Sequence, residues 1–252
     1  MSNYKLIGVG TNAKTVKGDS DEYLTAILYM TPYKVMVDGK MFNSCSMAKM
    51  ASCIDGCLNT AGLGALTNVQ SARQRKAEWF YRDRDSFMMQ LIEDISKFQR
   101  YCKRRDIQPV VRLNGTTDIR WELIRLGDYQ KNIFEMFPQV QFYDYTKIAN
   151  RKVSQIDNYH MTWSYSGANA QYSDMMDKAI DNGMNVAVVF RKPMQHETWK
   201  GYKVIDGDKD DLRIKDPKGN HIVALYAKGK AKRDTTGFVV DVNYTQTKGR
   251  QK

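Results

Sequence analysis

The sequence predicts a single α/β domain, built as a parallel-stranded sheet or an incomplete (β/α) barrel with outer helices and short antiparallel strands near both ends. Three observations predict this fold: strand-like and helix-like runs alternate, 42% of the 252 residues are hydrophobic, and no linker or repeat divides the chain. We expect N-terminal strands in 1–44, a cysteine and glycine loop in 45–66, helices and βα units in 67–200, and C-terminal strands with a basic tail in 201–252.

The N-terminal part reads as short strands. Residues 4–9 and 22–30 are rich in apolar and β-branched side chains, and Pro32 ends the second run. Residues 35–37 precede Asp38-Gly39, a pair favoured in hairpin turns. We therefore expect antiparallel strands near this end of the chain.

Two helices follow the cysteine and glycine loop. Residues 67–81 form the first, with Thr67 and Gln70 at the spacing of a capping box. Residues 86–104 form the second, because apolar side chains recur there at helical spacing: Phe87, Leu91, Ile95, Phe98 and Cys102. The pattern places Cys102 in the core.

The second half of the chain alternates between strands and helices. The runs 109–113, 139–145, 160–165 and 184–190 read as buried strands, and 172–182 as a helix closed by Gly183. Such alternation is typical of βαβ units in a mainly parallel sheet. Two further strands are expected at 222–226 and 238–242.

Cys45, Cys53 and Cys57 lie within thirteen residues of one another. Three thiolates can hold a metal or an iron–sulfur cluster and leave one coordination position open, as a catalytic centre requires. We predict that they ligate a 4Fe–4S cluster. A zinc site, a redox-sensing pair and three buried unliganded thiols remain alternatives; zinc is less favoured because no second closely spaced pair follows.

Glycines lead into the first helix. Gly62 and Gly64 expose backbone N–H groups near a helix start, where a carboxylate or phosphate can bind, although a plain glycine turn explains them equally well. Residues 8–15 nearly match a phosphate loop, but Ala13 replaces its last glycine and no apolar helix follows. We reject that loop and keep two of its residues as candidates for cofactor binding: Asn12 and Lys14.

Polar side chains follow several of the predicted strands. In parallel α/β folds, functional groups gather at the C-terminal ends of strands. We expect these side chains to lie together at that edge of the sheet. The candidate catalytic residues are Asp118, Arg120, Asp144 and Lys147, and the candidate cofactor-binding residues are Asn114 and Ser164. Ordinary polar surface loops are the alternative explanation.

The net charge of +11 is concentrated in two stretches. Residues 73–105 carry ten Lys or Arg against five Asp or Glu, and residues 228–252 carry seven against two. A nucleotide or nucleic acid partner fits this charge, as does a plain solvated basic surface. No segment approaches the ~20 apolar residues that span a bilayer, and no signal pattern opens the chain, so we expect no membrane partner and a cytosolic location.

Several of these segments together resemble the gene-product-eighty-eight family of bacteriophage proteins. They cover about residues 4–240 and include Gly8–Thr15, Cys57–Gly62, Asn68–Lys76, Arg112–Trp121, Phe142–Lys147, Asn185–Phe190 and Val204–Asp208. The resemblance implies a phage-encoded protein that acts in the host cytoplasm. It implies no particular reaction.

The cysteines, the nearby glycines and the strand–helix alternation are more loosely similar to radical S-adenosylmethionine enzymes. Those enzymes bind a 4Fe–4S cluster through three cysteines, with the cofactor on the fourth iron, in a partial α/β barrel. Here the spacing is C-x₇-C-x₃-C rather than C-x₃-C-x₂-C, and the strands before Cys45 look like a hairpin rather than a first barrel strand.

We therefore predict an iron–sulfur enzyme of radical type, with S-adenosylmethionine as candidate cofactor and a nucleotide or nucleic acid as substrate. One alternative is a non-enzymatic phage effector that binds nucleic acid or a host protein and has a structural cysteine site. Another is a divalent-metal hydrolase or nuclease that uses four carboxylates: Asp118, Asp144, Asp206 and Asp208.

Overall fold

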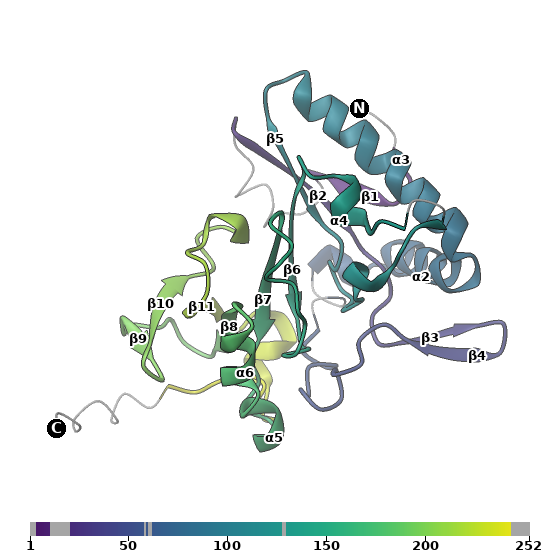
Figure 1. Cartoon of the computed structure of the whole chain (residues 1–252). Coiled ribbons are helices and arrows are strands. Elements are labelled where there is room, and N and C mark those ends of the chain that lie inside the picture. Colours follow the sequence, from purple (N-terminus) through teal and green to yellow (C-terminus); the bar gives the residue numbers. More distant parts are fainter. Residues whose placement is uncertain (1–3, 11–20, 58, 60–61, 128–129, 243–252) are drawn as a thin grey trace.

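A nine-stranded sheet organises the chain in the computed structural model, which describes residues 4–10, 21–57, 59, 62–127 and 130–242 (Figure 1). The strand order is β1-β2-β5-β6-β7-β8-β11-β10-β9. The strands are β1 (Ile7–Val9), β2 (Tyr23–Leu28), β5 (Gln108–Arg112), β6 (Gln141–Thr146), β7 (Tyr159–Ser164), β8 (Asn185–Phe190), β9 (Thr198–Trp199), β10 (Tyr202–Asp206) and β11 (His221–Tyr226).

The centre of the sheet is parallel. Strands β2, β5, β6, β7, β8 and β11 are parallel neighbours in chain order, and β10 pairs parallel with β11 on its far side. Strands β1 and β9 add antiparallel edges. The predicted α/β class and the short antiparallel strands near both ends are confirmed, and the sheet stays open rather than closing into a barrel.

A hairpin outside the main sheet joins β3 (Lys34–Val37) to β4 (Lys40–Asn43) and projects from the body of the molecule (Figure 1). The predicted turn is confirmed, since Asp38 and Gly39 both have positive φ, 48° and 76°, as a tight hairpin turn requires. Phe42 of the hairpin stacks on Tyr81, with ring centroids 4.6 Å apart.

Two long helices cover one end of the sheet: α2 (Thr67–Arg82) and α3 (Arg84–Lys103). The apolar stripe predicted for α3 is buried, including Cys102, and this helix packs on β1 and β5. The predicted capping box is wrong, because the residue that precedes α2, Leu66, makes no side-chain cap bond. The Gln70 amide instead donates to the carbonyls of Asn59 and Gly64.

Three other elements differ from the prediction. The helix expected at 172–182 is split into α5 (Ala170–Ser173) and α6 (Met176–Asp181), although Gly183 does follow it with φ of 79°. Residues 238–242 form a single bridge, Phe190 to Val240, rather than a strand. The short helix α4 (Ile133–Met136) was not predicted; its start is fixed by the capping box of Asn132 and Glu135.

The two faces of the sheet are covered differently. The helices share one large apolar core with side chains such as Val111, Phe142 and Trp163. On the opposite face, Leu212 packs on Val110 and Tyr143 as residues 207–217 cross over the strands. This crossing covers part of that face and leaves the carboxyl edge of the sheet as the place where loops from several strands meet.

Candidate functional site

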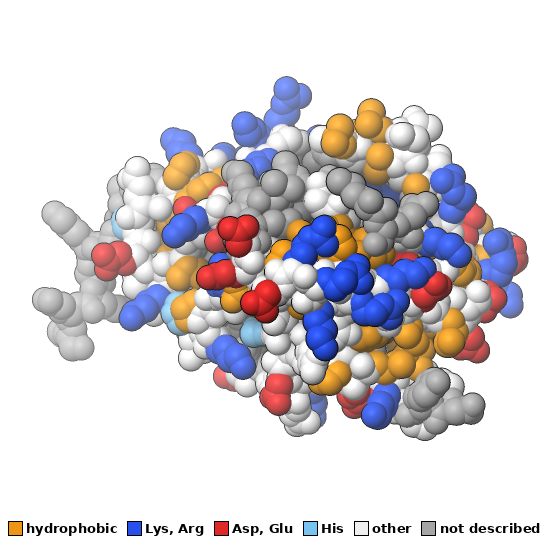
Figure 2. Space-filling model, turned by 90° about the horizontal axis from the view of Figure 1, so that it is seen from above, with side chains coloured by type: hydrophobic (Ala, Val, Ile, Leu, Met, Phe, Trp, Pro, Cys, Tyr) orange, Lys and Arg blue, Asp and Glu red, His pale blue; other side chains and the backbone are white. Residues whose placement is uncertain are grey.

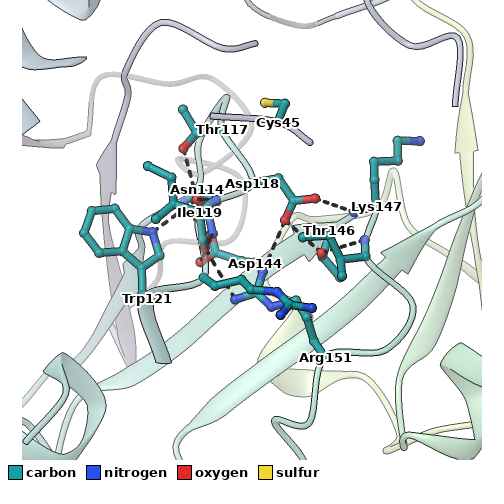
Figure 3. Close-up of polar contacts among 12 residues, drawn as sticks. Cys45, Asn114, Thr117, Asp118, Ile119, Trp121, Asp144, Thr146, Lys147 and Arg151 are labelled. Atoms are coloured by element: carbon teal, nitrogen blue, oxygen red, sulfur yellow. Dashed lines mark hydrogen bonds and ion pairs between the residues drawn. The ribbon is translucent and has the colours of Figure 1, made fainter. Parts of the chain in front are cut away.

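The loop after β5 is organised around Asn114. Its backbone N–H donates to the Asp144 carboxylate at 2.7 Å, and its side-chain oxygen accepts from Thr117, from the Ile119 N–H and from the Trp121 indole at 2.9–3.1 Å (Figure 3). Every polar atom of this buried amide is therefore used within the protein. Asn114 fixes the shape of the loop that carries Asp118.

Asp118 ties that loop to the end of β6. Its carboxylate accepts from the Thr146 hydroxyl at 2.8 Å, from the Lys147 backbone N–H at 2.7 Å and from the Arg151 guanidinium at 3.2 Å (Figure 3). Arg151 also pairs with Glu122 at 2.6 Å. Burial raises the pKa of Asp118, and the charge of Arg151 opposes that rise.

Asp144 lies on β6 and is fully buried. Besides the bond from Asn114, it accepts from the Tyr159 hydroxyl at 3.0 Å. Burial raises its pKa to about 7, against the opposing charge of Arg112. A carboxyl group with this pKa can exchange a proton near neutral pH, although its hydrogen-bond partners all belong to the protein.

Lys147 and Ser164 meet at the ends of neighbouring strands, as the sequence predicted. The Lys147 ammonium donates to the Ser164 hydroxyl at 2.8 Å and to its carbonyl at 3.0 Å. The ring of Phe238 lies 4.7 Å from the same nitrogen. Burial lowers the pKa of Lys147, and the nearby thiol of Cys53 opposes this effect.

The cysteine loop covers the same edge. The backbone N–H of Asp118 donates to the carbonyl of Ser44 at 2.8 Å, and the Cys45 thiol lies 3.8 Å from the carbonyl of Thr116. Figure 3 places Cys45 beside the loop that carries Asp118. Cys53 packs against the small apolar cluster that contains Phe238, and the Asn59 N–H reaches the Cys57 sulfur at 3.5 Å.

All three loop cysteines are half-buried, and none forms a disulfide. Burial raises the pKa of each thiol, to about 12 for Cys45. The three also influence one another, since Cys57 raises the pKa of Cys45 and Cys53 raises the pKa of Cys57. Within the part of the chain that the structure describes, however, no three His, Cys, Asp or Glu side chains are close enough to hold a metal ion.

Other predicted site residues are not part of this assembly. Arg120 points its guanidinium to Asn150, at 3.0 Å. Gly62 is exposed, whereas Gly64 is buried where a Cβ would lie 2.8 Å from the Asn59 carbonyl and 3.1 Å from Arg73, so packing explains this glycine. Two further candidates, Asn12 and Lys14, lie outside the described residues.

Three neighbours of the site were missed in the sequence: Arg73, Arg151 and Phe238. Phe238 belongs to the segment from Gly229 to Val240, which lies along the cysteine loop, where a Cβ on Gly56 would be 3.2 Å from the Phe238 ring. Arg191 holds this segment by donating to the carbonyls of Lys232 and Asp234. No local pattern marks these residues, because each contact joins distant parts of the chain.

The four carboxylates of the hydrolase alternative are divided. Asp118 and Asp144 lie at β5 and β6, whereas Asp206 ends β10 and Asp208 accepts from the Tyr226 N–H and from Lys228. Four strand spacings separate β6 from β10, each about 4.8 Å. This division does not favour a common metal site.

Basic side chains gather on a different face. Figure 2 views the molecule from above and shows Lys and Arg grouped over the middle of that face, next to a smaller group of Asp and Glu. The C-terminal end of α3 lies at the top of Figure 1 and contributes exposed basic residues: Arg100, Lys103, Arg104 and Arg105. Cations at a helix C-terminus also interact favourably with the helix dipole.

Comparisons with known proteins identify a family. A family model described as Gene product 88 matches residues 3–242. No match was found among curated proteins or among solved structures. Among the described residues, no helix is long and apolar enough to cross a bilayer.

Proposed function

The chain belongs to the Gene product 88 family of phage proteins, and we propose that it is an iron–sulfur protein in which Cys45, Cys53 and Cys57 hold a 4Fe–4S cluster. We further propose an enzyme of the radical type, with S-adenosylmethionine as its cofactor and a nucleotide or nucleic acid as its substrate, acting in the host cytoplasm. The observation that carries this proposal is the position of the cysteine loop at the carboxyl edge of the parallel strands.

Chain order supports the proposal. The cysteine loop follows β2, the first of six parallel strands that are neighbours in chain order, and only the β3–β4 hairpin intervenes. Partial barrels of radical enzymes place the cysteines after the first barrel strand. The β3–β4 hairpin lies between the parallel strand β2 and the cysteine loop, and this chain order is compatible with such a placement.

The donor set fits such a cluster in type and charge. The three thiols belong to one loop, none forms a disulfide, and two cations, Arg73 and Lys147, lower the pKa of Cys57 against the effect of burial. The loop would have to draw the sulfurs together on binding, since they do not form a metal site as they stand. A bound cluster with three thiolates would supply one-electron chemistry and one open iron.

The surrounding residues would take different roles. We assign positioning roles to three residues whose polar atoms form hydrogen bonds within the loops at the carboxyl edge: Asn114, Asp118 and Asp144. Lys147, fixed by Ser164, is the candidate for direct contact with substrate or cofactor, because its charge acts on two of the loop cysteines, Cys53 and Cys57.

Anaerobic reconstitution with iron and sulfide tests the proposal. The wild-type protein is expected to turn brown and to bind iron and sulfide in equal amounts, with an electron paramagnetic resonance signal on reduction. Single Cys→Ala changes at 45, 53 and 57 should abolish or sharply reduce uptake. Cys102→Ala is the matched control, because Cys102 lies in the α3 core, and it should load like wild type. A wild-type protein that stays free of iron would overturn the proposal.

A second candidate, nucleic acid binding without catalysis, rests on the exposed basic end of α3. Binding through phosphates weakens steeply as salt rises. Electrophoretic shifts with DNA and RNA at low and high salt, repeated with Arg104→Glu, test it. Shifts that are unchanged in that variant would exclude this surface.

A further inference from the structure

The outer face of the β3–β4 hairpin carries apolar side chains where a strand that faces water is normally polar. The register places Met36 directly opposite Met41, so both side chains leave the hairpin on the same side. These two residues are 50% and 52% exposed. The alternate residues of β3, Val35 and Val37, are buried, and β3 packs on α2. The methionine pair therefore lies on the face that points away from the body of the molecule.

The outer edge of β4 is a place where another strand can be added. The hairpin stands out from the rest of the fold (Figure 1), and β4 has no strand neighbour other than β3 among the described residues. Ser44 donates its backbone N–H to the carbonyl of Tyr33, and hydrogen-bonded pairs alternate along an antiparallel ladder. The backbone N–H and C=O groups of Met41 and Asn43 therefore point away from β3. An extended peptide that pairs with them would place alternate side chains beside Met41.

Two lysines determine which kind of strand fits this edge. Lys34 lies on the same face as the methionines and Lys40 follows the turn; both are exposed, and neither forms an ion pair with a described carboxylate. The one carboxylate of the hairpin, Asp38, pairs instead with Arg82 at 2.9 Å. Lysines on an open edge disfavour a second copy of the same hairpin, because like charges would meet. They attract a strand that carries carboxylates.

We propose that the β3–β4 hairpin is a docking surface for an extended, acidic segment of a partner protein. The segment adds to β4 as a third strand and packs its apolar side chains against the methionine pair. Methionine side chains are flexible and polarisable, so they can adapt to the shape of a partner. Strand addition supplies main-chain hydrogen bonds, and the alternate side chains supply specificity. This inference goes beyond the proposed function and does not depend on it, since it involves no cysteine and no cofactor.

The first experiment measures binding of a short fluorescein-labelled peptide of alternating Leu and Glu by fluorescence anisotropy. The wild type should bind it, and should bind a peptide of alternating Leu and Lys much more weakly. The double variant Met36→Thr/Met41→Thr should bind the acidic peptide about tenfold more weakly, because apolar burial is lost while the strand propensity is kept. Met36→Leu/Met41→Leu should bind like the wild type. Equal affinity in the wild type and the double Thr variant would overturn the inference.

The charge of the hairpin is tested against the charge of the whole protein. Lys34→Glu should weaken binding of the acidic peptide, whereas Arg104→Glu, the same charge change at the exposed basic end of α3, should have little effect. Equal weakening by both variants would show that net charge alone attracts the peptide, and the inference would then be wrong. Unchanged melting temperatures show that these variants are folded.

The second experiment locates the bound peptide by amide hydrogen exchange. Pairing along β4 should slow exchange at the backbone N–H groups of Met41 and Asn43. Protection confined to another element would overturn the inference even if the peptide binds. Sedimentation of the protein alone tests the other occupant. Self-association that Met36→Thr/Met41→Thr abolishes would show that a second copy covers the methionine pair, against the acidic partner proposed.

Discussion

Arg112 and Asp211 form an ion pair 3.0 Å long between β5 and the segment that crosses the opposite face of the sheet, with both side chains less than a tenth exposed. Asp211 also accepts from the hydroxyls of Tyr143 and Tyr145. Asp211→Ala would leave the Arg112 cation buried alone, and we expect it to lower the free energy of unfolding by about 3–5 kcal/mol. Urea unfolding measures this loss.

An exposed ion pair provides the control for that measurement. Arg82 and Asp38 pair at 2.9 Å, but both side chains are more than half exposed. Solvent screens such pairs, so Asp38→Ala should leave the stability nearly unchanged. If Asp38→Ala and Asp211→Ala lower the free energy of unfolding equally, burial does not explain the strength of the Arg112–Asp211 pair.

The stability of the protein should depend on the ionisation of Asp144. Burial raises its pKa to about 7 from an ordinary value of 3.8, so between these values the folded state holds a proton that the unfolded state has released. The contribution of this group to stability therefore falls as pH rises through this window. Asp144→Asn, which cannot ionise, should gain stability relative to wild type between about pH 4 and about pH 7. The measurement is the free energy of urea unfolding as a function of pH. If the profiles of Asp144→Asn and the wild type run parallel, the pKa of Asp144 is not raised in the folded state.

Phe238 should control access to part of the cysteine loop. Its ring lies next to Gly56 in the apolar cluster against which Cys53 packs, whereas Cys45 contacts Thr116 on the β5 side. Removing a buried aromatic ring weakens the packing by about 2 kcal/mol, so the segment should open locally more often. Phe238→Ala should speed iodoacetamide labelling of Cys53 several-fold relative to Cys45, as measured by mass spectrometry. Leu123→Ala, at an exposed site, should not.

Gly115 should resist substitution for a steric reason. A Cβ there would lie 2.7 Å from the Leu28 carbonyl and 2.7 Å from the Tyr29 ring. Gly115→Ala should therefore lower the free energy of unfolding by about 1–3 kcal/mol and disturb the loop that carries Asp118. Gly62 has positive φ but open space around its Cβ position, so Gly62→Ala should lower the free energy of unfolding by only about 1 kcal/mol. A smaller loss at Gly115 than at Gly62 would contradict the packing argument.

The parallel strands could be predicted because they are buried on both faces and read as continuous apolar runs, as in 109–113 and 184–190. The helix expected at 172–182 is interrupted between Ser173 and Met176, and no Gly or Pro in the sequence marks that break. The capping box at Thr67 failed because Gln70 bonds to the preceding loop instead.

The candidate site could be predicted only where a residue follows a strand. Lys147 and Ser164 meet as expected, because parallel neighbours place their ends at one edge. No local sequence pattern identifies Arg151 and Phe238 as site residues, because their partners lie far along the chain. Asn114, Asp118 and Asp144 were placed together correctly, but sequence alone does not reveal that protein groups occupy their polar atoms.

The edges of the nine-stranded sheet are short: β1 has three residues and β9 has two. An exposed edge strand offers unpaired backbone groups on which another chain can add itself as a further strand. Edges this brief offer few such groups, so neighbouring copies of the protein have little template for joining their sheets edge to edge into fibrils.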